Sequence, residues 1–590
     1  MKDFVKYMLA TVAGLFVFGI IVTALSVMSL VGMVASTEST TVVDDNSVLV
    51  INLSGIIDEQ SQDNLVGELI GSTVGSSGLN DMLNAIRKAK DNDRIKGIYI
   101  QAGALDTGYA TMEELRQALA DFKKSKKWIV AYADTYTQSA YYVASVADKV
   151  YLNPKGMLDL HGLGSQPMFY KDLFAKFGVH YQVVKVGTYK SFTESYTEDR
   201  MTEANREQVT AYLGGLWGNI CKAIAQDRKV SVDSLNAYAD RLIIFEPAEN
   251  LVRYKLVDGL LYADQVKAEV KKRLGLDDDD TICQLSVSDM QSVKDAPQKG
   301  DEIAVYYAYG SIVQMETGSQ LSGSHSIVMS DVCRDLEDLM NDDDVKAVVV
   351  RINSGGGDAY ASEQLWRQMS LLKAKKPVVV SMGDYAASGA YYMSCPASWI
   401  VAEPNTLTGS IGIFGVIPDL SELVTQKLGV KFDEVKTNRN STFGNVMARP
   451  LNSEEQTYLQ AYINRGYTLF RQRVADGRHK SVDEIEKIAQ GRVWIASDAL
   501  RIGLVDQLGT LDAAIAKAAQ LAKTDKYYTT EYPAPQSWVD QLLDFSAGDS
   551  YLDTKLRTTL GDLYEPYSLL LNLNHREAMQ ARVPFILQTK

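Results

Sequence analysis

Ser388 is the residue of this sequence best placed to act as a nucleophile. It lies in SMGDYAASGAYYMS, residues 381–394, between small neighbours that leave room for another backbone to approach. An apolar run precedes it and a helical pattern follows, so we expect its hydroxyl where free N–H groups and the positive end of a helix dipole converge. A serine that begins a helix is most often only an N-cap. Capping and nucleophilic attack are therefore both open for this position alone.

The second chemical motif is NSGGG, residues 353–357, directly after the apolar strand pattern VVVRI. Glycines after a buried strand let the backbone turn its N–H groups toward a ligand, as an oxyanion hole requires. Gly356 and Gly357 are the candidate donors. A plain strand-to-helix loop is the alternative interpretation of the same residues.

A serine hydroxyl needs a base at neutral pH, and no histidine lies near these motifs. The candidate base is Lys190 in KVGTYKS, residues 185–191. A lysine with its ordinary pKa of about 10.4 is almost fully protonated at pH 7. Lys190 would therefore need a buried environment that favours the neutral amine.

The chain contains two copies of one unit. A shift of 250 residues aligns them without an insertion from the pair Asp81 and Asp331 to the pair Gly162 and Gly412. The closing segments LVDGL at Leu256 and LVDQL at Leu504 follow with a slip of only a few residues. This indicates a tandem duplication, because the repeats of a solenoid are far shorter.

The two copies differ where chemistry is expected. Ser388 corresponds to Gln138 in the first copy, and Lys190 corresponds to Ser441 in the second. The glycine run is also missing from the first copy, which reads GALDT at residues 103–107. Each copy thus lacks a group that the other holds, which predicts a serine–lysine pair at the interface between the copies.

Strand and helix patterns alternate within each copy. In the second, residues 346–352 and 377–382 are expected strands, residues 361–372 an expected helix, and Ser388 opens the next helix. This order predicts an α/β fold with parallel strands. The predicted organisation is an N-terminal anchor with a short linker, a first repeat, a joint, a second repeat and a C-terminal tail, at residues 1–44, 45–291, 292–301, 302–526 and 527–590.

Composition excludes several classes of protein. The 590 residues are 46% hydrophobic and 23% charged, as in globular proteins, and the formal charge of −14 disfavours nucleic acid as a partner. The cysteines at 221, 283, 333 and 395 lie far apart without metal-ligand spacing. We predict neither a metal site nor a cofactor, and interpret the acidic run at residues 277–280 as a solvated turn.

The N-terminal region predicts a membrane span. Residues 7–37 contain no charged side chain, and the apolar core exceeds the roughly 20 residues needed to cross a bilayer. A cleaved signal peptide is the alternative, although its apolar region is usually about 7 to 15 residues. Lys2 and Lys6 precede the span and acidic residues follow it, so the catalytic part is expected outside the cytoplasm.

Four motifs together resemble the long form of the signal peptide peptidase A family, also called protease IV. They are GDYAASGAYYMS, NSGGG, GTYKS and GRVWIASDALRIGLVDQLG, and the likeness extends from the N-terminal span to about Lys523. One departure is Gly355, where the family usually has proline before two glycines.

The resemblance implies that Ser388 is the nucleophile and Lys190 the general base. It implies backbone donors at Gly356 or Gly357 and at Gly389 for the oxyanion. It also implies tandem crotonase- or Clp-protease-like domains, a homotetramer facing the cytoplasmic (inner) membrane from the periplasm, and cleavage of remnant signal peptides. An extended peptide with small or apolar side chains, lying beside a strand edge, is the expected substrate.

Two rival functions remain open from the sequence. One is a crotonase-like acyl-CoA enzyme, in which glycine N–H groups hold a thioester enolate. The other is a non-catalytic membrane-anchored scaffold. The sequence also leaves open whether the dyad forms within one subunit or between subunits.

Overall fold

The structure is a computed structural model. It describes residues 41–61, 77–294, 299–315, 325–534 and 579–582, together with Gly14 and Phe18. Among these residues no helix has the length and apolar character needed to cross a membrane. The span predicted at residues 7–37 lies, apart from Gly14 and Phe18, outside the described residues.

The first repeat is built on a parallel sheet with strand order β2-β1-β3-β4-β5-β7, and β8 pairs with β1. Its strands are β1 (Ser47–Asp58), β2 (Ser77–Gly78), β3 (Ile95–Asp106), β4 (Trp128–Tyr136), β5 (Lys149–Leu158), β7 (Gly259–Leu260) and β8 (Gln284–Leu285). Its helices are α3 (Leu79–Asp91), α4 (Tyr109–Lys123), α5 (Gln138–Ala144), α8 (Glu203–Arg228), α9 (Val232–Asp240), α10 (Ala248–Arg253), α11 (Ala263–Leu274) and α12 (Val287–Gln291).

The second repeat has a sheet with order β18-β16-β14-β12-β9-β20, with β15 beside β14 and β19 beside β15. Its strands are β9 (Asp301–Tyr309), β12 (Val345–Ser354), β14 (Val378–Ala387), β15 (Trp399–Ala402), β16 (Leu407–Gly409), β18 (Val493–Ile495), β19 (Gln507–Leu508) and β20 (Tyr527–Tyr532). Its helices are α13 (Met329–Asn341), α14 (Ala359–Lys375), α15 (Gly389–Ser394), α16 (Ser453–Arg478), α17 (Val482–Ile488), α18 (Ala496–Arg501) and α19 (Leu511–Ala522). The tail predicted from residue 527 thus begins with β20, an edge strand of this sheet.

The apolar run in β12 has a simple cause, because both faces of its sheet are covered. Val348 and Val350 belong to the core that includes α13, α14 and α15. Val349 points the other way, into a smaller core with α19. β12 is therefore apolar at successive residues rather than at alternate ones, and it pairs in parallel with β14, so the C-terminal ends of the two strands lie side by side.

A third, mixed sheet lies where the repeats meet, with order β11-β10-β13-β21-β17-β6. Its strands are β6 (His180–Lys185), β10 (Ser311–Val313), β11 (Ser326–Val328), β13 (Gly356–Asp358), β17 (Phe414–Asp419) and β21 (Met579–Arg582). The short helices α6 (Lys171–Phe177) and α7 (Glu194–Thr197) flank β6. Strands from both repeats and from the end of the chain thus share one sheet.

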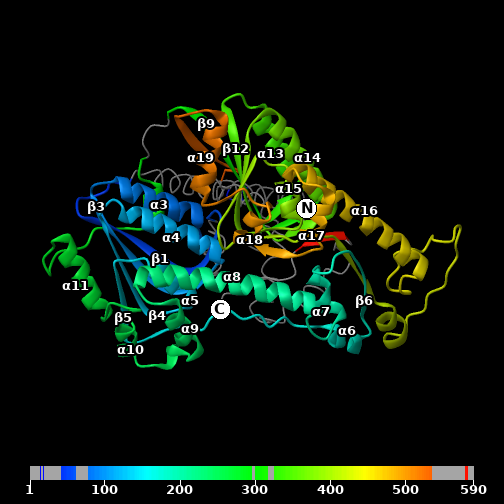
Figure 1. The fold of residues 1–590 in the computed structure, drawn as a ribbon, viewed down its shortest axis with the longest axis horizontal. Helices are drawn as coiled ribbons and strands as arrows, with labels where there is room; N and C mark the ends of the chain where they lie inside the picture. The colour runs from blue at the N-terminus through cyan, green and yellow to red at the C-terminus, as the bar shows by residue number, and fades with distance from the viewer. Residues whose placement is uncertain are drawn as a thin grey trace, which may run out of the picture.

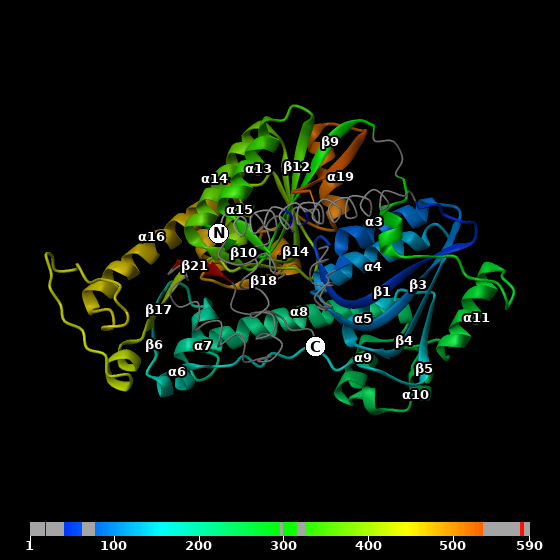
Figure 2. The ribbon, with the colours of Figure 1, turned by 180° about the vertical axis from the view of Figure 1, so that it is seen from behind.

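Helix α8 links the two repeats physically. In Figure 1 it runs across the molecule from the first repeat toward α7, and it packs on α5 of the first repeat and on β18 of the second. Figure 2 shows the same arrangement from behind, with β6 and β17 side by side. The chain that leaves the first sheet at residue 158 therefore reaches across to the second repeat before α8 returns.

Candidate active site

Ser388 occupies a sharp turn between β14 and α15. Its backbone has φ 58° and ψ −116°, a region that L residues rarely adopt. The turn is held by hydrogen bonds from the Ser388 N–H to the Gly409 carbonyl, 2.8 Å, and from the Tyr392 N–H to the Ser388 carbonyl, 2.8 Å. The hydroxyl makes no capping bond to α15. The N-cap interpretation of this serine is therefore wrong, and its hydroxyl is directed elsewhere.

Lys190 reaches that hydroxyl from the first repeat. Its Nζ lies 2.7 Å from Ser388 Oγ, so the sequence-predicted pair is in hydrogen-bonding contact within one chain. The same Nζ lies 3.1 Å from the Ser410 carbonyl oxygen and 3.0 Å from Ser410 Oγ. These three contacts fix the position of the lysine nitrogen beside the serine.

The surroundings of Lys190 favour the neutral amine. The side chain is fully buried, and this burial lowers its pKa well below the ordinary value. Burial is the cause of this lowered pKa, and no charged group among the described residues offsets it, so a positive charge on Lys190 would have no counter-charge there. The nearest aromatic face is Phe414, with its ring centre 5.8 Å away. An amine held in this way can accept a proton.

Gly491 of the second repeat makes room for Lys190. A Cβ at Gly491 would lie 2.7 Å from the Lys190 backbone nitrogen. The neighbouring Tyr189 N–H donates to the Gln490 carbonyl, 2.9 Å. The lysine loop of the first repeat is therefore packed directly onto the second repeat.

The glycine loop lies next to the same turn, because β13 packs against α15. Gly356 has φ 97°, and its N–H donates to Ser354 Oγ, 3.1 Å. Gly357 has no space for a side chain, since a Cβ would lie 2.0 Å from the Ile312 carbonyl oxygen. Gly389 is the first residue of α15, where N–H groups point away from the helix. Gly389 thus follows Ser388 directly, and Gly356 and Gly357 lie on β13, which packs against α15, although the Gly356 N–H has a partner in this conformation.

The equivalent place in the first repeat is filled by Gln138. Its Oε1 accepts from the N–H groups of His161, 3.1 Å, and Gly162, 2.9 Å, while its Nε2 donates to Tyr109 Oη, 3.1 Å. The amide is buried and fully engaged. The first repeat therefore has a buried amide at the place where the second repeat has the Ser388 hydroxyl, which Lys190 of the first repeat contacts.

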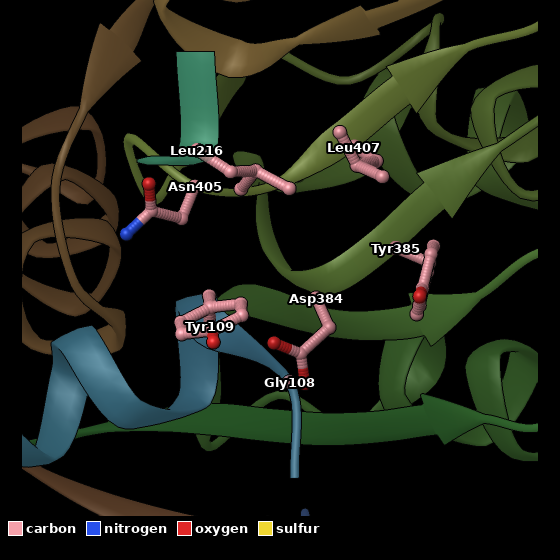
Figure 3. Close-up of a pocket in the computed structure, with 7 residues that line it drawn as sticks. All are labelled: Gly108, Tyr109, Leu216, Asp384, Tyr385, Asn405 and Leu407. Atoms are coloured by element: carbon pink, nitrogen blue, oxygen red, sulfur yellow. The ribbon is translucent and has the colours of Figure 1, made fainter. Parts of the chain in front are cut away.

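A small crevice lies between the two repeats near the Ser388 turn, and Figure 3 shows residues of both repeats pointing into it. The Asp384 carboxylate there accepts from the N–H groups of Ala110, 2.9 Å, and Thr111, 3.0 Å, at the start of α4. The crevice is lined by Gly108, Tyr109, Leu216, Asp384, Tyr385, Asn405 and Leu407. Asp384 lies in β14, the strand that leads into the Ser388 turn, so this contact between the repeats helps to position that turn.

Sequence reasoning missed two contributors to the site. Ser410 contacts Lys190 through a backbone with φ 51°, and Gly491 accommodates the lysine loop. The only sequence signal for Ser410 is its place directly after the LTG strand, in SIGIF, and a positive φ at serine has no signature. Gly491 lies far from Lys190 in sequence, so its role becomes visible only when the repeats are packed.

Similarity to known proteins identifies the family of this chain. Residues 121–277 and 370–525 each match Peptidase family S49. The chain belongs to peptidase family S49. It is therefore a serine peptidase, and the two matched regions lie in the two repeats.

Relatives of this S49 peptidase extend over most of its length. It is 35% identical to Protease 4 of Salmonella typhi over 563 residues, which covers 92% of this chain and 88% of the relative. It is 30% identical to the chloroplastic serine protease SPPA of Arabidopsis thaliana, over 92% of this chain and 78% of the relative. ClpP1 from Listeria monocytogenes is 17% identical over 35% of this chain and 91% of its own, with a TM-score of 0.21. A TM-score this low says nothing about how the two repeats are arranged.

Proposed function

We propose that this S49 peptidase is an endopeptidase in which Ser388 is the nucleophile and Lys190 the general base. The observation that supports this most strongly is the 2.7 Å contact between Lys190 Nζ and Ser388 Oγ, made by a fully buried lysine. A hydroxyl beside a neutral amine is an activated nucleophile, because the amine can take its proton as the oxygen attacks.

In the proposed acylation step, Ser388 Oγ forms a bond to the carbonyl carbon of the substrate while its proton passes to Lys190 Nζ. The negative charge that develops on the carbonyl oxygen is stabilised by the Gly389 N–H and by the N–H of Gly356 or Gly357. The C–N bond then breaks, and the leaving amine takes the proton from Lys190.

Deacylation repeats the same transfers with water. Neutral Lys190 takes a proton from the water as its oxygen attacks the acyl carbon, and Ser388 Oγ recovers that proton as the ester bond breaks. Ser410 holds the lysine nitrogen in place through both steps. No cofactor is needed for either step.

We further propose that the substrates are remnant signal peptides and other extended peptides, cleaved on the periplasmic side of the cytoplasmic membrane. The apolar residues 7–37 would anchor the chain there, and four copies would assemble as a homotetramer. The anchor is tested by extracting membranes with alkaline carbonate, which should release a chain lacking residues 1–40 but not the full chain. Sedimentation of the detergent-solubilised full chain tests the number of subunits.

The dyad is tested by following cleavage of a fluorogenic apolar peptide by Ser388→Ala, Lys190→Ala and Lys190→Arg. Each variant is expected to lose at least about 1,000-fold in kcat, because loss of one member disables the pair. Lys190→Arg is included because a guanidinium stays charged and cannot act as a base. Lys155→Ala and Ser441→Ala, at exposed positions, are the matched controls and should cleave as the wild type does. Undiminished turnover in the Lys190 variants would reject this mechanism.

A further inference from the structure

Helix α8 places a buried amide against the loop that carries Lys190. The side chain of Gln208, on this helix, is completely buried. Its Nε2 lies 3.0 Å from the Tyr189 carbonyl oxygen and 3.0 Å from Ser191 Oγ. Tyr189 and Ser191 are the two chain neighbours of Lys190. One amide thus contacts the chain on both sides of the proposed base.

The oxygen of the same amide contacts the second repeat. Gln208 Oε1 accepts from the Val493 N–H at the start of β18, 3.1 Å. Val493 lies opposite Gly409 in the antiparallel pair of β18 and β16. The Gly409 carbonyl in turn accepts from the Ser388 N–H, 2.8 Å. Gln208 therefore joins the loop of Lys190, through two short strands, to the turn of Ser388.

The start of β18 also positions the second group that contacts the lysine nitrogen. The Ser410 N–H donates to the carbonyl of Arg492, 2.7 Å. The Arg492 Nη1 lies 3.1 Å from Tyr189 Oη and 2.8 Å from Glu207 Oε1, on the helix residue next to Gln208. The loop of the base and both serines that contact its nitrogen are therefore tied to residues 492 and 493.

The counterpart of Gln208 in the second repeat has a different environment. Helices α8 and α16 align with the shift of 250 residues, as AYL at 211–213 and AYI at 461–463 show. Gln208 then corresponds to Tyr458, which is 57% exposed and donates to Glu454 Oε1. The buried amide is thus found in the copy that supplies the lysine, and a surface side chain takes its place in the other copy.

A buried amide with partners on several elements constrains their relative positions. Gln208 Nε2 also lies 3.2 Å from Asn205 Oδ1 on the same helix. Leaving a buried donor or acceptor without a partner costs free energy, so the loop, the helix and β18 are favoured in the one arrangement that satisfies the amide. Without it, the Tyr189 carbonyl and the Val493 N–H would lose this shared partner. The loop could then move relative to β18, and Lys190 Nζ relative to Ser388 Oγ.

We propose that Gln208 is a positioning residue of the Ser388–Lys190 pair, which sets the distance between base and nucleophile by joining the Lys190 loop to β18. This inference rests on the proposed function, because it assigns a role in the same proton transfer. Gln208 contacts neither of the two reacting atoms. It acts on them through the backbone of the loop and through β18 and β16.

The first test is Gln208→Met in the full chain, because methionine has a similar length and cannot make these hydrogen bonds. The kcat on a fluorogenic apolar peptide should fall about 10- to 100-fold with little change in KM, since a displacement of about 1 Å can cost about 100-fold. Saturating labelling of Ser388 with a serine-directed electrophile counts the folded sites. A wild-type kcat per labelled site would show that the variant only folds in smaller amount, and would overturn the proposal.

The matched control is Gln182→Met. Gln182 on β6 also joins the repeats through its amide, which donates to the Leu451 carbonyl, 3.1 Å, and accepts from the Leu451 N–H, 2.7 Å. These contacts do not include residues 189–191 or β18, so this variant should keep the wild-type kcat. Equal losses in the two variants would point to a general need for packing between the repeats, and would overturn the proposal.

A milder variant covers the case in which Gln208→Met does not fold. Gln208→Asn keeps a polar amide in the buried site, but it is one methylene shorter and too short to contact Tyr189 and Val493 together. Its kcat per labelled site should also fall while KM changes little. A wild-type kcat in Gln208→Asn would overturn the proposal.

The pH profile provides a readout that a purely structural role would not change. Burial lowers the pKa of Lys190, and a loop that moves away from β18 admits water to the amine. The rising limb of kcat/KM should therefore shift to higher pH in Gln208→Met, because the amine is less strongly desolvated. It should stay in place in Gln182→Met. The same limb in the wild type and in Gln208→Met would overturn the proposal.

Hydrogen exchange separates this proposal from the proposed function, because it requires no turnover. In full-length Ser388→Ala, the amide hydrogens of residues 189–191 and 492–494 should exchange slowly, and Gln208→Met in that background should accelerate both sets. Unchanged exchange at both sets would overturn the positioning role. Accelerated exchange together with undiminished peptide cleavage by Lys190→Ala and Lys190→Arg would instead reject the proposed function, while the contact between loop and β18 would stand.

Discussion

At the scale of single residues, Lys190 is held by three hydrogen-bonding contacts, and two of them come from Ser410. The Ser410 carbonyl can only accept, so it orients an N–H of the amine away from Ser388. That leaves the lone pair of a neutral lysine free to face Ser388 Oγ. Ser410 is thus a positioning residue.

Replacing Ser410 by alanine should lower kcat about 10- to 100-fold with little change in KM, because the lysine loses one of the contacts that orient it for proton transfer. Ser410→Thr keeps the hydroxyl and should recover much of the loss. Steady-state kinetics on a peptide substrate measures both values. A fall in KM and kcat by equal factors would point to a changed substrate complex instead of a misplaced base.

The pH dependence of catalysis follows from the buried lysine. Burial lowers the pKa of Lys190 well below its ordinary value, and only the neutral amine can accept the serine proton. The rate should therefore rise with pH through this lowered pKa and reach a plateau at pH values where an ordinary lysine is still charged. The pH profile of kcat/KM measures it, and a limb that continues to rise up to the ordinary lysine pKa would contradict the assignment.

Stability has a related pH dependence, with a sign that can be worked out. Between the lowered pKa and the ordinary one, the unfolded chain binds a proton at Lys190 and the folded chain does not. The free energy of unfolding thus increases with pH across this window. Lys190→Met should remove this slope and be the more stable protein below the window. Urea denaturation at several pH values compares the two proteins.

At the scale of elements, the loop that carries Lys190 lies close against the backbone of Gly491 in the second repeat. Gly491 has φ 79°, and a Cβ there would lie 2.7 Å from Lys190 N. The position of the base therefore depends on a residue about three hundred positions further along the chain.

Gly491→Ala should destabilise the protein by about 1–3 kcal/mol for the unfavourable φ, and it should lower kcat as well because the collision displaces Lys190. Gly429 is a matched control, since it has φ 74° but open space around its Cβ position. Gly429→Ala should share the conformational cost and keep full activity. Equal activity of the two variants would show that the collision does not reach the lysine.

Much of the element pattern was accessible from sequence. The expected strands at 346–352 and 377–382 correspond to β12 and β14, and the expected helix at 361–372 lies within α14. Each is a run of apolar or periodic residues whose local sequence carries its own signal. The prediction of an α/β fold is confirmed by the sheets and by the two S49 matches.

The parts that sequence did not reveal depend on contacts between distant residues. The backbone conformation of Ser410 and the room left by Gly491 are set by packing of the two repeats. Strand β21 is the extreme case, because it pairs with β13 and β17, which lie far from it in the sequence. The contact between Lys190 and Ser388 was accessible because comparison of the two copies shows which group each one lacks, and the family resemblance implies the same pair.

At the scale of the whole molecule, the repeats are joined by buried charge. Arg351 of the second repeat donates to Glu59, 2.8 Å, and Glu114, 2.7 Å, both from the first repeat, and all three side chains are almost completely buried. Each carboxylate therefore depends on a partner from the other repeat.

Arg351→Met should destabilise the protein by about 3–5 kcal/mol, because it leaves two carboxylates buried without their counter-charge. Arg334, which pairs with Asp331 and Asp335 at the surface, is the control, and Arg334→Met should have little effect. Chemical denaturation followed by tryptophan fluorescence measures the difference. If both variants lost the same stability, the contact between the two repeats would not depend on the buried cluster of Arg351, Glu59 and Glu114.

The division of the dyad between repeats has a numerical consequence. Gln138 closes the counterpart of the serine turn, so duplication has left a single reactive hydroxyl where two identical halves would have offered a pair. Saturating labelling with a serine-directed electrophile should stop at one adduct per polypeptide, at Ser388. However many copies associate, catalytic centres and chains should be present in equal number.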